Sequence, residues 1–135
     1  MELSSYFILG LNHVLDLSAY DHMLYIAMML CNVDLKNWKR IIGVITAFTI
    51  GHSLSLSYVV LSAPILSSSI VEFLIPITIL VTAILGLIST KSNVQYKRLY
   101  LLTTFFGLIH GFGFAGFLKS MLPSSEHIWS MLLGF

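Results

Sequence analysis

The feature that most constrains this chain is an uncharged, apolar segment over residues 41–62 that carries a histidine near its centre. The segment contains no Asp, Glu, Lys or Arg, and its length is what an α-helix needs to cross a bilayer core of roughly 30 Å. His52 then lies near half depth. An ionisable side chain at that depth is costly unless it faces protein, water or a ligand, so it marks a candidate functional site.

Hydroxyl side chains accompany His52 at helical spacing. Thr46, Thr49 and His52 recur every three residues, and Ser53 follows Thr49 by four. Residues three and four apart share one face of a helix. We therefore expect Thr46, Thr49 and Ser53 to form a supporting polar stripe beside His52.

The composition identifies an integral membrane protein and excludes several other classes. Of 135 residues, 57% are hydrophobic and 10% are charged, far from the balance of an average soluble domain. Seven cationic and six anionic residues provide no basic patch for nucleic acid. Cys31 is the only cysteine, which excludes an intrachain disulfide and a cysteine-based metal cage.

The hydropathy pattern predicts an all-α fold, a polytopic transmembrane bundle of about four to five membrane helices. A short helix over 3–15 is expected to lie in the interface or to re-enter from one side, because it is too short to span. Candidate spans follow over 18–32, 41–62, 70–89 and 99–118, and a further apolar segment begins at residue 128. We expect a single integral membrane domain over residues 1–135.

The basic residues predict the orientation of these spans. Six of the seven lie in the loops 34–40 and 91–98, on one side of an up-and-down path: Lys36, Lys39, Arg40, Lys91, Lys97 and Arg98. By the positive-inside rule this side is cytoplasmic. The turns at 16–20 and 62–69 are then expected at the outer face.

With this topology, every acidic or histidine side chain within the membrane lies between its outer face and its middle. Imidazole is a ligand for nickel, zinc, copper or iron, and carboxylate for harder ions. The inner half holds no such group, which counts against a simple through-channel. We predict one site for a divalent metal, with Asp16 beside it, Asp21 and Glu72 balancing its charge, and imidazole ligands from His13, His22, His52 and His110.

Two glycines predict how the fourth span packs. Gly107 and Gly111 are four residues apart and flank His110, and small residues at this spacing let a neighbouring helix approach closely. We expect the helices that carry His52 and His110 to touch.

Each candidate residue also has a purely structural interpretation. Asp16 and Asp21 can cap a turn or a helix, and Glu72 can favour the positive N-terminal end of its helix. His52 and His110 can be histidines that are hydrogen-bonded without any ligand. The residues alone leave these alternatives open.

Five motifs in order resemble the HupE/UreJ family of bacterial membrane proteins, and together they cover nearly the whole chain. They are His13-Val-Leu-Asp, Tyr20-Asp-His-Met-Leu-Tyr25, Thr46-Ala-Phe-Thr-Ile-Gly-His-Ser53, Val71-Glu-Phe-Leu-Ile-Pro76 and Phe106-Gly-Leu-Ile-His-Gly-Phe-Gly-Phe-Ala115. The polar positions that match are His13, Asp21, His22, His52, Glu72 and His110.

The resemblance implies a bacterial inner-membrane protein linked to hydrogenase or urease systems and a cargo of nickel or cobalt, with zinc, iron or copper left open. Family members continue into a further helix with a Glu and Gln motif, whereas this chain stops at Phe135, so we expect it to be truncated at the C-terminal end. Candidate partners are the lipid bilayer, a second copy of the chain and a metalloenzyme maturation system.

Three functions are compatible with these features. The favoured one is a membrane protein that binds a divalent transition metal from the outer side and assists its transport. The second is a membrane metalloenzyme whose ion activates water or oxygen near the outer leaflet. The third is a non-catalytic accessory protein of the hydrogenase or urease type. Distances among the candidate ligands distinguish the first two from the third.

Overall fold

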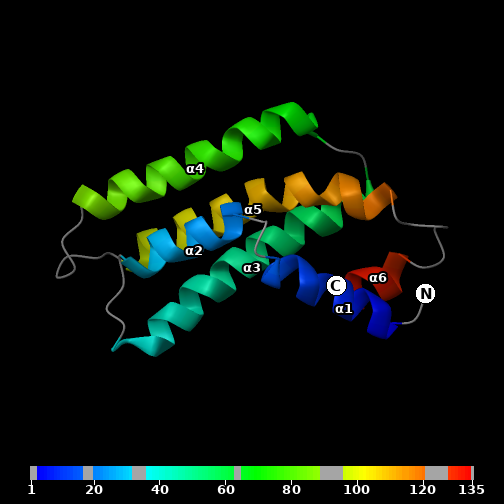
Figure 1. Ribbon diagram of the computed structural model, residues 1–135, viewed down its shortest axis with the longest axis horizontal. Helices are drawn as coiled ribbons and strands as arrows, with labels where there is room; N and C mark the ends of the chain where they lie inside the picture. The colour runs from blue at the N-terminus through cyan, green and yellow to red at the C-terminus, as the bar shows by residue number, and fades with distance from the viewer. Residues whose placement is uncertain are drawn as a thin grey trace.

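The computed structural model describes residues 3–16, 20–31, 36–62, 65–88, 96–120 and 128–134. All regular secondary structure in these residues is helical: α1 (Leu3–Leu15), α2 (Tyr20–Cys31), α3 (Trp38–Leu61), α4 (Ser68–Ile88), α5 (Tyr96–Ser120) and α6 (Ile128–Gly134), as Figure 1 shows. The all-α class expected from the sequence is confirmed for this part of the chain.

Two helices, α3 and α4, are long and apolar enough to cross a membrane by length and composition. The sequence predicted four to five such helices, so the described residues support fewer than expected. α5 has 25 residues but is not one of these two helices. For the other predicted spans the reason is helix length, because α2 has 12 residues and α6 has 7. At about 1.5 Å per residue both are shorter than a hydrocarbon core of about 30 Å.

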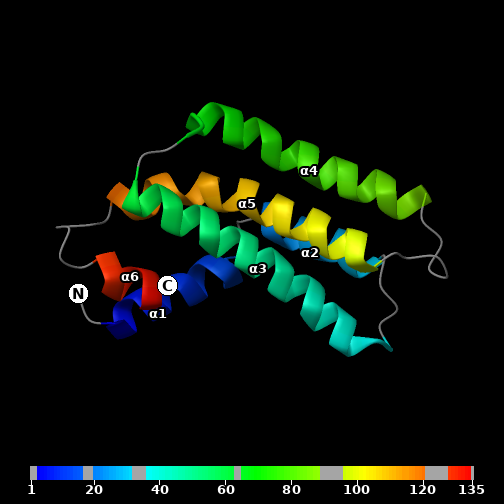
Figure 2. The same cartoon turned by 180° about the vertical axis from the view of Figure 1, so that it is seen from behind.

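The two N-terminal helices lie along different halves of α3. α1 lies beside the half of α3 that leads to its C-terminal end, and α2 lies toward the end where α3 begins (Figures 1 and 2). The end of α1 and the start of α2 are therefore near mid-height, not at the outer face where the sequence predicted them. This correction matters because His13 ends one half-length helix and His22 begins the other.

The close pair in the fold is α3 with α5, which form the most extensive helix contact. Glycines on both helices permit it, because a methyl group at Gly51 would overlap the Thr104 carbonyl and one at Gly107 would overlap the Phe48 carbonyl. Gly111 lies against the His52 carbonyl in the same way. The contact expected between the helices that carry His52 and His110 is present.

The remaining helices cover this pair. α4 packs on α2 and α5, and α6 packs on α1. The outer surface of α4 is strongly apolar, with Phe73 67% exposed and Leu87 88% exposed. Exposed side chains of this size are the kind that face lipid or another apolar partner.

Five basic residues gather at one end of the bundle: Lys36, Lys39, Arg40, Lys97 and Arg98. Lys119 lies near the other end of α5. The Arg40 guanidinium at the start of α3 lies 3.8 Å from the centre of the Tyr96 ring at the start of α5. This cation–π contact brings together the two helix starts that carry exposed Lys39 and Lys97. Residues 34–35 and 91–95 of the two predicted basic loops lie outside the described residues.

Candidate metal centre

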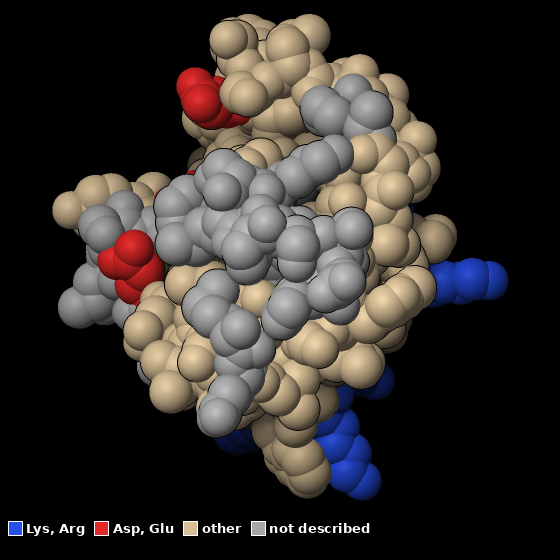
Figure 3. Space-filling model, turned by 90° about the vertical axis from the view of Figure 1, so that its right-hand side faces the viewer, with Lys and Arg blue, Asp and Glu red and all other residues tan. Residues whose placement is uncertain are grey.

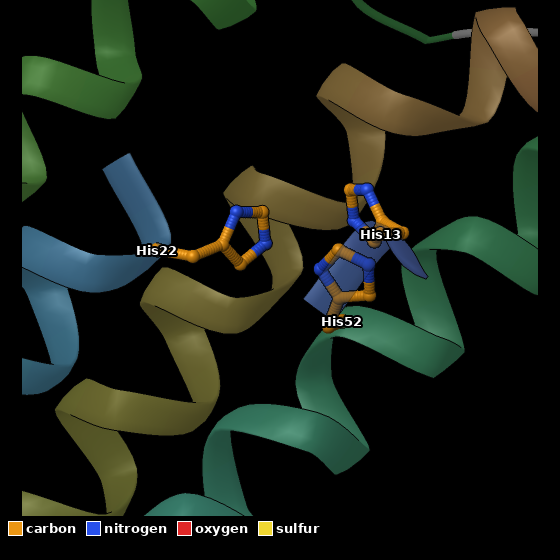
Figure 4. A group of neighbouring side chains, drawn as sticks. All are labelled: His13, His22 and His52. Atoms are coloured by element: carbon orange, nitrogen blue, oxygen red, sulfur yellow. The ribbon is translucent and has the colours of Figure 1, made fainter. Parts of the chain in front are cut away.

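Three histidines from three helices meet at the junction of α1 and α2. His13 ends α1, His22 begins α2 and His52 lies in the middle of α3, and all three are partly buried. Figure 4 shows their rings turned toward one shared space. Their ring centroids are 5.0 Å apart for His13 and His22, 5.8 Å for His13 and His52, and 5.7 Å for His22 and His52. We call these three residues the histidine site.

The spacing of the histidine site is close to that of a metal centre. One nitrogen from each ring lies within 4.8 Å of the others. Two nitrogens on opposite sides of one ion are separated by at most about 4.2 Å, twice a metal–nitrogen distance of about 2.1 Å. A pair of nitrogens at the 4.8 Å limit must therefore close by at least about 0.6 Å. Because only one pair of ligands can lie opposite each other, the other pairs must come closer still, through rotation of the side chains about their χ angles.

Asp21 orients one of these ligands. Its Oδ1 lies 3.3 Å from Nδ1 of His22. Because an ionised carboxylate can only accept, the His22 Nδ1–H is the donor. This leaves the Nε2 lone pair of His22 available to a metal, the arrangement that carboxylates give to metal-binding histidines. Asp21 also supplies negative charge beside the site.

His110 adjoins the histidine site from α5. Its side chain is 2% exposed, and its ring centroid is 5.8 Å from that of His22. The Nδ1–H donates to the Phe106 carbonyl at 2.8 Å, so the lone pair is on Nε2. Nε2 is buried and has no hydrogen-bond partner among the described residues. Nε2 of His110 is thus available as a further metal ligand next to the histidine site.

Aromatic rings that were not predicted from the sequence to be site residues lie around the imidazoles. Phe114 stacks on His13 with centroids 3.7 Å apart. On the other side Phe48 lies 6.0 Å from His52 and 5.3 Å from His110. Their spacing in the sequence could have indicated this role. Phe48 precedes His52 by four residues and Phe114 follows His110 by four, which puts each ring on the same helix face as a histidine.

Several predicted site residues are not brought to this cluster. Glu72 is exposed on α4. Asp16 is also exposed, just after α1, but it lies near enough to interact electrostatically with His13. The acidic atoms visible in Figure 3 lie in separate places rather than in one patch. Thr46, Thr49 and Ser53 are exposed as well, and the Thr49 hydroxyl donates to the Ile45 carbonyl of its own helix. The structure thus does not join the predicted polar stripe to the imidazoles.

The electrostatics of the site favour a cation over protons. Two protonated imidazoles at about 5 Å would repel each other in a partly buried site. One divalent ion can satisfy several lone pairs at once. The donor set, imidazole nitrogens with a carboxylate behind them, suits nickel, cobalt, zinc, copper or iron(II).

The fold and the site together define a helical protein with membrane-type apolar helices and a partly buried histidine cluster. A family model described as HupE / UreJ protein matches residues 1–135. The chain therefore belongs to the HupE/UreJ family, as its motifs predicted. The family and the two apolar helices indicate a membrane protein. Searches of curated proteins and of solved structures returned no match.

Proposed function

We propose that this protein binds a divalent transition metal, nickel or cobalt, in the histidine site and assists its passage across the bacterial inner membrane. The observation that carries the proposal is the convergence of His13, His22 and His52 within 4.8 Å. These residues come from α1, α2 and α3, so the fold rather than local sequence assembles the ligands. Family membership supports a role in nickel or cobalt handling.

The division of the first crossing into α1 and α2 supports a transport role. Broken helices at mid-depth are a common way for transporters to build ion sites, because their free ends offer carbonyl groups and helix dipoles to the ion. The C-terminal end of α1 carries partial negative charge, and His13 lies in its last turn. In this proposal α1 and α2 cross together, and α5, with 25 residues, is a further crossing.

The orientation in the proposal follows from the basic end of the bundle. Exposed Lys36, Lys39, Arg40, Lys97 and Arg98 lie at the starts of α3 and α5. With this end in the cytoplasm, the opposite end, where α3 ends and α4 begins, receives the ion. The imidazoles replace part of its hydration shell, and Asp21 lowers the electrostatic barrier to its entry.

Nickel influx into proteoliposomes tests this function. We expect purified protein in sealed vesicles to take up radioactive Ni²⁺ at a rate about tenfold or more above empty vesicles, with little competition from Mg²⁺, which prefers oxygen ligands. Co²⁺ should compete. Tight binding without influx would refute transport and favour the accessory or enzymatic alternative. A protein that neither binds nor moves either ion would contradict the proposal altogether.

A further inference from the structure

A buried tyrosine hydroxyl lies directly beside the histidine site. Tyr25 follows His22 by one helical turn on α2 and is 1% exposed. Its ring centroid is 5.4 Å from that of His110. Its hydroxyl has no formed hydrogen bond among the described residues. A buried hydroxyl without a partner is unfavourable, so its retention in a native fold calls for an explanation.

Two threonine hydroxyls face Tyr25 from other helices. Thr82 on α4 is 5% exposed and Thr103 on α5 is 0% exposed. Both lie close enough to the Tyr25 hydroxyl to interact with it, but neither forms a hydrogen bond of standard geometry with it. Thr82 donates its only hydroxyl proton to the Thr78 carbonyl at 2.8 Å, and Thr103 donates its own to the Leu99 carbonyl at 2.7 Å. The threonines therefore offer oxygen lone pairs, not protons, to the space they share.

These hydroxyls lie on the side of the histidines that leads to the basic end of the bundle. Thr103 precedes His110 by seven residues, or about 10 Å along α5. An aromatic layer separates the two sets, because the Tyr25 ring packs 4.9 Å from Phe48 and 5.8 Å from Phe106. Tyr25 alone belongs to both, with its ring in the aromatic layer and its oxygen beyond the imidazoles.

We propose that Tyr25, Thr82 and Thr103 form a second, oxygen-only station that receives the divalent cation from the histidine site on its way to the basic end. This inference rests on the proposed function. Neutral hydroxyl oxygens hold nickel or cobalt less tightly than imidazole nitrogens do. An ion can therefore leave such a station, as conduction requires.

The test removes single hydroxyls from the full-length protein and measures two quantities, Ni²⁺ binding by calorimetry and Ni²⁺ influx into proteoliposomes. Tyr25→Phe should slow influx by about tenfold or more, because a contact to a charged ligand is lost. Thr82→Val and Thr103→Val, which keep the side-chain shape, should also slow it. Nickel affinity at the histidine site should stay within about threefold in all three variants.

Thr78→Val is the matched control. Thr78 is also a buried threonine on α4, 4% exposed, and its hydroxyl donates to the Ile75 carbonyl. This variant should keep wild-type influx. Tyr25→Phe should keep the wild-type melting temperature, since the hydroxyl it removes has no formed hydrogen bond. If it nevertheless misfolds, the two valine variants carry the test.

The outcomes separate this inference from the proposed function. Wild-type influx that persists in the three variants would overturn the second station and leave the proposed function intact. Loss of nickel binding in parallel with influx would also overturn it, because the hydroxyls would then belong to the first site. A wild-type protein that shows no nickel influx would overturn both.

Discussion

Replacing His52 by alanine is expected to lower the nickel affinity of the protein by on the order of 100-fold or more, because one of three converging imidazoles is lost. His52 lies in the middle of α3, where Gly107 and Gly111 of α5 pack against its backbone, so the contact between the two helices holds it in place. The measurement is calorimetric titration of the detergent-solubilised protein with Ni²⁺. Retained affinity would mean that His52 only packs.

Ser53→Ala is the matched control for this change. Ser53 is the next residue on α3, and its side chain is exposed. The structure predicts unchanged nickel affinity for this variant, whereas the polar stripe expected from the sequence predicts a loss. A reduced nickel affinity in Ser53→Ala would support the predicted polar stripe and contradict the site geometry described above.

The geometry of α3 explains why the predicted polar stripe does not face the histidine site. At about 100° per residue, Thr46, Thr49 and Ser53 lie roughly 60–120° around α3 from His52. The buried face of α3 lies on the other side of His52 and includes Phe48 and Ser55. Spacing of three and four residues indicated a common face but not which edge of that face meets the other helices.

The sequence did predict where the two central histidines lie, and the limits of α3, α4 and α5 within a few residues. It did not predict that His13 and His22 would reach His52. That arrangement arises because α1 and α2 are two half-length helices that lie along successive halves of α3. Two short apolar runs separated by polar residues are equally compatible with an interfacial helix, and only packing against α3 decides between them.

Gly107→Ala is expected to destabilise the protein by about 1–3 kcal/mol, because the added methyl group would overlap the Phe48 carbonyl. The close approach of α3 and α5 holds His52 and His110 in position, so the helices must separate to admit the methyl group. For a domain of this size the midpoint of thermal unfolding in detergent should fall by about 3–11 °C. Nickel affinity should fall in the same variant.

Gly116→Ala provides the control on the same helix. A methyl group at Gly116 would meet no atom within 4 Å, so this change tests the helix propensity of alanine alone. Alanine is the better helix former by about 1 kcal/mol, and the variant should be as stable as the wild type or more so. Equal destabilisation by both changes would show that helix contact at Gly107 is not the cause.

Ionisable groups alone led to the prediction that the inner half of the spans holds no ligand. The structure shows that Tyr25, Thr82 and Thr103, which lie toward the basic end of the bundle, are buried. Hydroxyl residues are common in apolar helices and usually donate to their own backbone, so their positions in the sequence carried no information. Their shared orientation becomes visible only when α2, α4 and α5 are packed together.

X-ray absorption spectroscopy of the nickel-loaded protein tests the central claim most directly, that imidazoles from three helices bind one ion. The spectrum should contain a nitrogen or oxygen shell at about 2.0–2.1 Å and the multiple-scattering pattern of about three imidazole rings. His52→Ala should remove one ring from that pattern. A spectrum with only water and carboxylate oxygens around the ion, and no imidazole scattering, would contradict the account.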